Sequence, residues 1–287
     1  TSTISGSLVN NGNVVINKGQ LTLSGGGAGS GGFSLKGTAH LKFAGGKSYT
    51  VDGKVDDLGD SGSLTVADAG TTATFNGPCE AATTSVNTGA SATWNGTTEV
   101  KAFNNSGDTV FNRDITLYTL YSTGTIGGSG NITISKTCSS NHGWRGGTIE
   151  GTGTLTVGPS GVFPLTGSSE KNLNRKLINN GTVNILSGTA KFNAPVENPG
   201  QLSISKDCTQ VSMYKGYTQA NTGEISFDIG GDTDFTSVNV AAALTLDGEL
   251  HINLVNEYTP AAGTAFKLLG YPAGIAPGPD NRFAAVT

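Results

Sequence analysis

The sequence predicts an all-β protein built as a β-solenoid, which is a stack of similar coils. Three observations lead to this prediction. Short alternating strands recur along the chain, glycine is very abundant, and one two-strand unit occurs twice with nearly the same sequence. Two short strands have one apolar face and cannot bury it alone, so the unit needs a copy of itself above and below. We expect on the order of a dozen coils of roughly 20 to 25 residues each.

The repeated unit is the clearest of these observations. Residues 179–192 read N-N-G-T-V-N-I-L-S-G-T-A-K-F, and residues 10–23 read N-N-G-N-V-V-I-N-K-G-Q-L-T-L. The Asn-Gly step supplies a sharp corner, and the residues after it alternate apolar and polar side chains with period two. Each copy therefore predicts two strands and two corners, and Ile185 is expected in the core.

The composition also favours many short strands joined by tight corners. Glycine contributes 44 of 287 residues, roughly twice its usual share, and the charged fraction of 13% is about half the usual one. The glycines lack collagen's three-residue period, and the alternating apolar residues argue against disorder. The net charge of −4 is small and no basic run interleaves with aromatics, so nucleic acid is not an expected partner. No apolar stretch approaches the ~20 residues of a membrane-spanning helix, so membrane insertion is not expected.

Individual strands are easiest to place in the first 76 residues. They are predicted at residues 21–23, 33–35, 41–43, 49–51, 64–66 and 74–75, with glycine-rich corners between them. A second repeat, G-T-I-x-G-x-G-x-[IL]-T-[IV], occupies residues 124–134 and 147–157. If the coils stack in register, its matching threonines and aliphatic residues form ladders.

The last part of the chain carries a more specific pattern. Residues 216–270 contain, in order, Y-x-Q, G-x-[IL]-x-[FV]-x-[IL]-G-G, a strand of small residues, L-D-G-x-L and Y-x-P-x-x-G-x-x-F-x-[LV]-L. This order resembles the distal passenger repeats of bacterial autotransporter-type and related surface β-helix proteins. The resemblance implies a right-handed parallel β-helix, extracellular display at the cell surface, and an adhesive or structural role. It implies no shared catalytic residues.

These patterns suggest three segments. Residues 1–212 are predicted to form β-solenoid repeats, residues 213–270 the passenger-like C-terminal coils that continue the solenoid, and residues 271–287 a tail rich in proline and glycine.

Three cysteines, Cys79, Cys138 and Cys208, lack metal-ligand spacing, and at most one disulfide can form within the chain. Cys138 and Cys208 end similar predicted strands at residues 132–138 and 202–208, so a Cys138–Cys208 disulfide is one prediction. The alternative is that all three are small buried side chains.

Catalytic and metal-binding groups are sparse. The carboxylates of residues 56–60 could pair with His142 and Arg145 in a groove, but some 85 residues, or about four coils, separate the two groups at this repeat length. No catalytic residue is therefore assigned. Two acidic groups could bind Ca²⁺ through their carboxylate oxygens: residues 52–60, and Asp228 with Asp232 and Asp234. Neither group fits a known calcium-loop spacing. No other metal or cofactor is expected.

We therefore expect a non-enzymatic, secreted or surface-displayed structural protein that acts as a spacer, an adhesin segment or a filament subunit. Its expected partners are a host surface, a glycan, or copies of itself stacked end to end. The alternative is a glycan-binding or glycan-cleaving β-helix. The candidate glycan contacts are Trp94, Tyr118, Tyr121 and Trp144.

Overall fold

The structure is a computed structural model that describes residues 1–138, 143–271 and 282–287. The described chain is all-β, and its parallel sheets stack as a β-solenoid of about 11 turns, which confirms the predicted fold class. No helix in these residues is long and apolar enough to cross a membrane. Most of the predicted proline- and glycine-rich tail, residues 272–281, lies outside the described residues.

The described chain divides into two compact units. Unit 1 comprises residues 1–133 and 151–153, and unit 2 comprises residues 134–150 and 154–287. Strand β18 (Ile132–Ile134) contains residues of both units.

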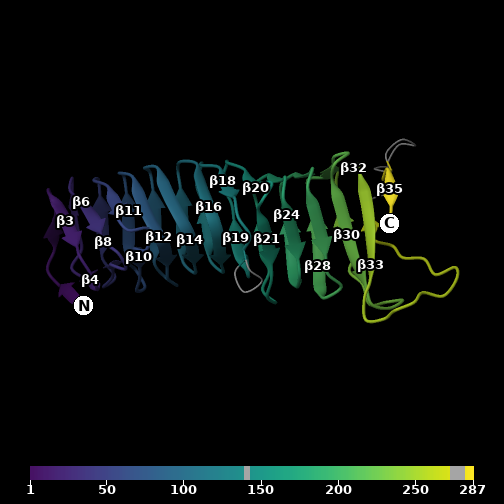
Figure 1. Ribbon diagram of the computed structural model, residues 1–287, viewed down its shortest axis with the longest axis horizontal. Helices are drawn as coiled ribbons and strands as arrows, with labels where there is room; N and C mark the ends of the chain where they lie inside the picture. Colours follow the sequence, from purple (N-terminus) through teal and green to yellow (C-terminus); the bar gives the residue numbers. More distant parts are fainter. Residues whose placement is uncertain (139–142, 272–281) are drawn as a thin grey trace. The chain divides into compact units, whose positions relative to one another are not determined.

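In unit 1 each coil adds one strand to each of three parallel sheets, and strands of neighbouring coils lie side by side (Figure 1). The first sheet follows the order β1 (Ser2–Ile4), β4 (Gln20–Leu23), β7 (His40–Phe43), β10 (Ser63–Val66), β12 (Cys79–Val86), β14 (Thr98–Asn105) and β16 (Ile115–Ser122). The second contains β2 (Leu8–Val9), β5 (Gly27–Gly29), β8 (Ser48–Val51), β11 (Thr72–Phe75), β13 (Ser91–Trp94), β15 (Asp108–Phe111) and β17 (Thr125–Gly127). The third begins with β3 (Asn13–Ile16), β6 (Gly32–Leu35) and β9 (Val55–Asp57).

Strands β12, β14 and β16 are twice as long as their neighbours because each serves two sheets. The start of β12 pairs with β9, through Cys79 and Val55, while its end pairs with β10 from Ser63 to Val66. The pairing of β12 with β14 skips one residue in each strand, between Ala81 and Thr83 in β12. Each of the three strands therefore turns from the third sheet into the first without an intervening loop.

Unit 2 has the same three-sheet plan (Figure 1). One sheet contains β20 (Leu155–Val157), β23 (Leu177–Asn179), β26 (Val196–Asn198), β29 (Tyr217–Gln219) and β32 (Leu244–Thr245). The next contains β19 (Gly147–Ile149), β22 (Lys171–Leu173), β25 (Gly188–Phe192), β28 (Cys208–Met213), β31 (Val238–Val240) and β34 (Leu269–Gly270). The last contains β21 (Val162–Leu165), β24 (Thr182–Ile185), β27 (Gln201–Ile204), β30 (Glu224–Ile229), β33 (Glu249–Leu254) and β35 (Ala285–Val286).

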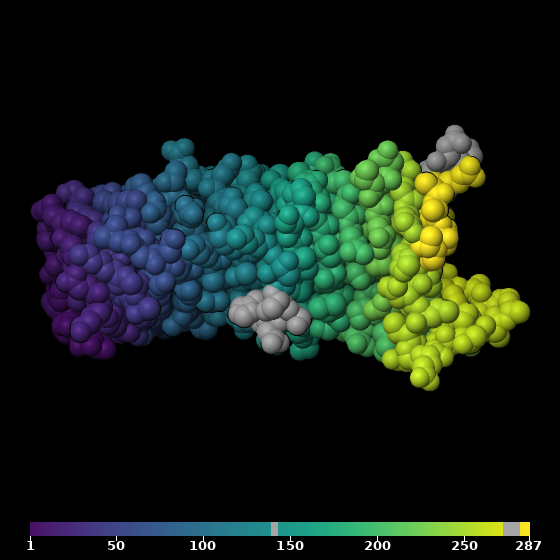
Figure 2. Space-filling view, viewed as in Figure 1, coloured from purple at the N-terminus to yellow at the C-terminus, as the bar shows by residue number. Residues whose placement is uncertain are grey.

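The segment after β33, residues 255–268, projects from the coils of unit 2 as a yellow-green loop (Figure 2). The ring of Phe266 in this segment packs edge-on against Tyr258 of the same segment and against Phe235, which lies between β30 and β31.

The two copies of the repeated unit form the predicted strands. Residues 10–23 contain β3 and β4, and residues 179–192 contain β24 and β25. The alternating apolar residues point inward, so Ile185 is fully buried and its place in the core is confirmed. In the second repeat, residues 124–134 contain β17 and β18, and residues 147–157 contain β19 and β20.

In-register pairing stacks the inward side chains into columns along each unit. In unit 1 one column runs through Leu41, Leu64, Thr84, Phe103 and Leu120, all fully or almost fully buried. Each coil thus buries its apolar residues on the coils before and after it, as the pattern predicted.

Glycine columns form several of the corners, where one coil lies directly on the next. A Cβ atom on Gly96 would lie 2.1 Å from the carbonyl oxygen of Gly77, and one on Gly77 would lie 2.5 Å from that of Gly53. In unit 2, a Cβ on Gly200 would lie 2.3 Å from the oxygen of Gly181. These contacts leave no room for a side chain, and they account for part of the high glycine content.

Candidate functional site

Acidic side chains from three successive coils line up on the outer face of unit 1. Glu80 of β12 pairs in register with Glu99 of β14, and the pairing of Cys79 with Val55 places Asp56 of β9 beside Glu80. We call Asp56, Glu80 and Glu99 the carboxylate row. Neighbouring parallel strands lie ~4.8 Å apart, and like charges facing each other at that spacing repel.

Two lysines offset part of this repulsion. Lys54 Nζ lies 2.9 Å from Asp56 Oδ1 and 3.0 Å from Glu80 Oε2. Its hydrogen bonds, first to Asp56 and then to Glu80, raise the pKa of the Lys54 ammonium. Lys101 Nζ lies 3.3 Å from Asp60 Oδ1. No ion pair of Glu99 is present among the described residues, and its side chain faces solvent.

A surface depression lies beside the row where β12 and β14 bend. It is lined by Asp57, Asp60, Glu80, Ala81, Ala82, Glu99 and Lys101. The Asp57 carboxylate is held in place because Oδ2 accepts hydrogen bonds from the backbone N–H groups of Gly62 (2.9 Å) and Ala82 (3.0 Å). Asp57 therefore shapes the bend and Glu80 is paired with Lys54, whereas Glu99 remains open to a ligand.

The carboxylate row has the spacing needed for one kind of chemistry. Glycosidic bonds are cleaved by carboxylate pairs roughly 5 to 9 Å apart, a separation that two adjacent strands can supply. The same oxygens can accept hydrogen bonds from sugar hydroxyls. The row and the depression beside it are therefore the candidate site in unit 1.

Trp94 and Trp144 do not lie on the surface, which corrects their assignment as glycan contacts. Each is 1% exposed. In β13 the side chain of Trp94 points inward, as does that of Ala92 two residues earlier. The indole stacks between two phenyl rings, with centroid distances of 5.4 Å to Phe75 and 5.0 Å to Phe111. Trp144 stacks on Phe163 and donates from Nε1 to the carbonyl of Gly146. Both indoles fill the core.

Tyr118 and Tyr121, the other two candidate glycan contacts, are half-buried in β16. The register places Lys101 level with Tyr118, since Val100 pairs with Leu117 and Ala102 with Thr119. Tyr118 therefore lies at the bend of β16, next to Lys101 at the bend of β14 and one coil beyond the depression. Tyr121 pairs with Asn104 on the adjoining sheet.

The predicted Cys138–Cys208 disulfide is not formed, and Cys79, Cys138 and Cys208 are all buried thiols. The bridge between Thr137 and Val162 places Cys138 beside Phe163 of the next coil. Phe163 pairs with Val183, and Val183 pairs with Leu202, which belongs to the coil that carries Cys208. Three coil steps of ~4.8 Å are about 14 Å, twice the span that a disulfide can bridge. The alternative, that the cysteines are core side chains, agrees with their burial.

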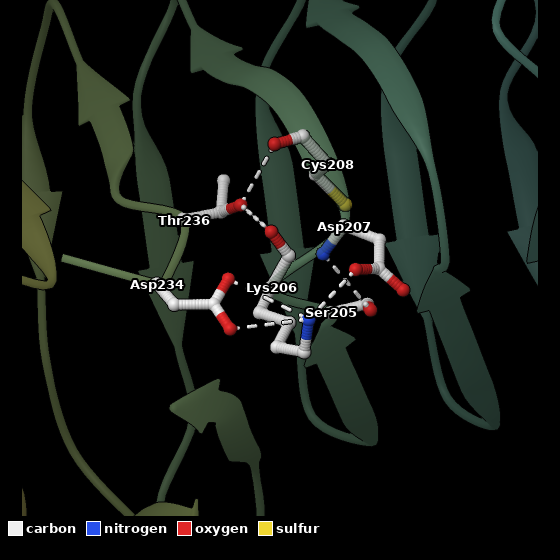
Figure 3. Close-up of polar contacts among 6 residues, drawn as sticks. All are labelled: Ser205, Lys206, Asp207, Cys208, Asp234 and Thr236. Carbon is white, nitrogen blue, oxygen red and sulfur yellow. Dashed lines mark hydrogen bonds and ion pairs between the residues drawn. The ribbon is translucent and has the colours of Figure 1, made fainter. Parts of the chain in front are cut away.

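A second polar cluster lies in unit 2, around Lys206 (Figure 3). Lys206 Nζ lies 3.0 Å from Asp207 Oδ1 and 3.2 Å from Asp234 Oδ2. The Thr236 hydroxyl lies within hydrogen-bond distance of the carbonyl oxygens of Lys206 (3.1 Å) and Cys208 (2.8 Å). These contacts fasten the loop after β30 to the corner before β28.

The neighbouring thiol is not activated for chemistry. Cys208 Sγ points at the carbonyl oxygen of Ile185, and burial raises the pKa of the thiol to about 12. A thiol with this pKa stays protonated near neutral pH and is a poor nucleophile. We therefore interpret the Lys206 cluster as structural.

The other candidate groups do not assemble into a metal site. In the ranges that the structure describes, no three His, Cys, Asp or Glu side chains are placed to hold a metal ion. Asp228 accepts a hydrogen bond from Asn253, and Asp232 accepts one from Tyr258. His142 lies outside the described residues, and Arg145 belongs to unit 2, whereas the carboxylates of residues 56–60 belong to unit 1.

Sequence reasoning did not single out Glu80, Glu99, Lys54 or Lys101. Lys54 lies within the acidic run of residues 52–60, and Glu80 and Glu99 stand in different coils whose lengths differ. A fixed repeat period therefore cannot align them. Only the strand register reveals the row.

The comparisons with protein-family models, curated proteins and solved structures find no match for this chain. The fold defines its class, a parallel β-solenoid, and this part of the resemblance to surface β-helix proteins is confirmed. No match supports an assignment to the autotransporter-type proteins.

Proposed function

We propose that this chain is a non-enzymatic, extracellular structural or adhesive β-helix that serves as a surface spacer, an adhesin segment or a filament subunit. One observation carries the proposal. Among the described residues, buried polar side chains such as Asn179 and Asn198, and corner side chains such as Asn76 and Asn95, bond to a neighbouring coil. The extracellular location rests on the resemblance of residues 216–270 to surface β-helix proteins.

A buried polar ladder in unit 2 illustrates this use of polar groups. Asn179 Nδ2 donates to Asn198 Oδ1 (2.7 Å), and Asn198 Nδ2 donates to the Tyr217 hydroxyl (3.0 Å). That hydroxyl donates to Gln219 Oε1 (2.7 Å), and Gln219 Nε2 reaches the carbonyls of Asp247 and Glu249. The ladder crosses successive coils and satisfies the carbonyls at their corners.

An exposed counterpart runs along unit 1, and we call it the asparagine ladder. Asn112 Nδ2 donates to Asn95 Oδ1 (2.8 Å), Asn95 Nδ2 to Asn76 Oδ1 (2.7 Å), and Asn76 Nδ2 to Asp52 Oδ1 (2.7 Å). The ladder links four coils through side chains on one corner.

Two buried cations have the same role in unit 2. Lys171 is fully buried, and Nζ donates to the carbonyl oxygens of Gly167 (3.0 Å), Ser169 (2.9 Å) and Ser187 (3.3 Å), while burial lowers the pKa of its ammonium. Arg175 donates to the carbonyl of Glu150, and burial lowers its pKa to about 10. Neither is aimed at an external ligand.

The proposal is tested by imaging, by adhesion and by an activity screen. Electron microscopy of the purified protein over a range of concentrations distinguishes a filament subunit, which gives fibres with a regular axial repeat, from separate particles. Beads coated with the protein should attach to a subset of cell or matrix surfaces more than albumin-coated beads do. Release of reducing ends or unsaturated products from any polysaccharide in a broad panel would overturn the non-enzymatic assignment.

The carboxylate row favours a second candidate function, a glycan-binding or glycan-cleaving β-helix. Its support is the in-register pair Glu80 and Glu99, the depression beside them, and Tyr118 one coil beyond Lys101 on the same bend. In this reading sugar hydroxyls bond to the carboxylates and Tyr118 supplies an aromatic surface.

A glycan array decides whether this second function applies. The parent protein is compared with Glu99→Gln and with Glu249→Gln, a control that belongs to unit 2 and is not a member of the row. Binding or cleavage that is lost in Glu99→Gln and kept in the control would support the second function. If the parent neither binds nor cleaves any glycan, the second function is excluded.

A further inference from the structure

Four Asn-Gly steps occur in this chain, at Asn11, Asn76, Asn95 and Asn180. The step at Asn180 belongs to the repeated two-strand unit, where it forms a corner. The structure holds these four side chains in different ways, and the difference bears on a covalent reaction that Asn-Gly steps undergo in water.

In this reaction the backbone nitrogen of the glycine attacks the side-chain Cγ of the asparagine. A C–N bond forms to close a succinimide ring, the bond from Cγ to the side-chain nitrogen breaks, and ammonia leaves. Water then opens the ring to aspartate or isoaspartate. Glycine permits the attack because no Cβ obstructs its nitrogen. The side-chain amide must first rotate toward that nitrogen, so hydrogen bonds that hold it elsewhere oppose the reaction.

Asn76 and Asn95 are held in this way by the asparagine ladder. The Asn95 amide donates to Asn76 and accepts from Asn112, and the Asn76 amide donates to Asp52 and accepts from Asn95. The nucleophile at Asn95 is also engaged, since the N–H of Gly96 donates to the carbonyl of Phe75. Rotation of either amide breaks two side-chain hydrogen bonds.

Asn180 is exposed, and its side chain makes no hydrogen bond among the described residues. Its neighbour Asn179 points inward and is tied to Asn198 and to the Gln201 carbonyl. The backbone N–H of Asn180 donates to the carbonyl oxygen of Val157 and fixes the backbone there. The side-chain amide of Asn180 is free to turn toward the nitrogen of Gly181. Asn11 is not a matched case, because its coil is paired on one side only.

We propose that Asn180 is a site of spontaneous deamidation in the folded protein and that the asparagine ladder protects Asn76 and Asn95 from the same reaction. The position makes the product damaging. Isoaspartate adds a methylene to the backbone just before Gly181, where even a Cβ atom would lie 2.2 Å from the oxygen of Gly158. Conversion at Asn180 should therefore distort this corner of unit 2.

The test follows the native protein at pH 8 and 37 °C by peptide mapping and mass spectrometry, which separates asparagine, aspartate and isoaspartate. We expect Asn180 to convert about tenfold or more faster than Asn76 and Asn95, the factor expected when two ordinary hydrogen bonds must break. The same measurement in concentrated urea should give similar rates at Asn95 and Asn180, since both are followed by Gly-Thr.

A ladder variant separates protection by hydrogen bonds from general rigidity. The double variant Asn76→Ala/Asn112→Ala removes both side-chain partners of Asn95, and its folding is verified by circular dichroism and thermal melting. We expect Asn95 then to convert several-fold faster than in the parent, although the bond from the Gly96 N–H to the Phe75 carbonyl remains. Equal native rates at Asn95 and Asn180 in the parent, or unchanged protection of Asn95 in a folded double variant, would overturn the proposal.

Discussion

At the scale of single residues, the interior accepts polar groups where the next coil supplies a partner. Asn198, Tyr217 and Gln219 are almost fully buried, and each bonds to a neighbouring coil. Thr84 is an exception. It is fully buried in the column between Leu64 and Phe103, and its hydroxyl has no hydrogen-bond partner among the described residues.

Replacing this hydroxyl by a methyl group should therefore stabilise the protein. Thr84→Val keeps the side-chain shape and removes an unsatisfied polar atom, which we expect to raise the free energy of unfolding by about 1 kcal/mol. Urea unfolding measures the change. The matched control is Thr83→Val on the outward face of the same strand, where little change is expected. A loss of stability in Thr84→Val would mean that the hydroxyl is satisfied in solution.

The buried cysteines predict how stability depends on pH. Burial raises the thiol pKa values of Cys79 and Cys208 from 9.0 to about 12. An unfolded chain loses these protons near pH 9, whereas the folded chain keeps them to higher pH. Their contribution is therefore complete below pH 9 and is lost as the pH rises toward 12, by up to about 1.4 kcal/mol per pH unit for each thiol.

Urea unfolding under reducing conditions between pH 8 and pH 11 measures this slope. The double variant Cys79→Ala/Cys208→Ala should be less stable at neutral pH, because it leaves cavities, but its stability should decline less steeply above pH 9. Parallel curves for parent and variant would show that other groups cause the alkaline loss.

At the scale of strands and corners, alternation and glycine content were enough to place the elements. The predicted strands at residues 41–43, 49–51 and 64–66 lie within β7, β8 and β10. The same alternation also indicates that Trp94 is buried, because Trp94 lies two residues after the buried Ala92 in the same strand. Trp144 lies outside the named strands and pairs only through an isolated bridge with Leu165, so no alternating pattern set its direction. The carboxylate row could not be predicted, because it depends on the register between coils of unequal length.

The glycine corners make a prediction at this scale. Gly96→Ala places a Cβ atom against the backbone of Gly77, which cannot move without shifting its own coil, and we expect a loss of about 1–3 kcal/mol. Thermal and urea unfolding provide the measurement. Gly12→Ala is the control, since a Cβ atom there has nothing within 4 Å, and it should be neutral. If both variants melt alike, the backbone at the Gly96 corner has room for a Cβ atom, and the stacking of the corners does not exclude side chains.

At the scale of the whole molecule, each coil contacts mainly the coils before and after it, so stability should be close to a sum over neighbours. The buried ladders follow the same rule, because their members bond to the next coil. A complete coil should therefore be removable.

Deletion of residues 182–200 tests this in unit 2. It removes β24, β25 and β26 together, so that β27 takes the place of β24 beside β21, β28 that of β25, and β29 that of β26. We expect a folded β protein with a cooperative transition. Deletion of residues 182–190, which cuts a coil in part, should instead abolish folding by breaking the register of every later strand. Circular dichroism and proteolysis compare the two variants, and equal behaviour would argue against coils as independent units.

The glycine columns also set which parts of this chain can change by inheritance. Every single-base change in a glycine codon that keeps the reading frame open and alters the residue introduces a Cβ atom. At Gly77, Gly96 and Gly181 that atom meets backbone of the preceding coil. The outward side chains of the strands face no such restriction. We therefore expect descendants of this gene to vary on their faces, which are the surfaces that a partner meets, while the corners stay fixed.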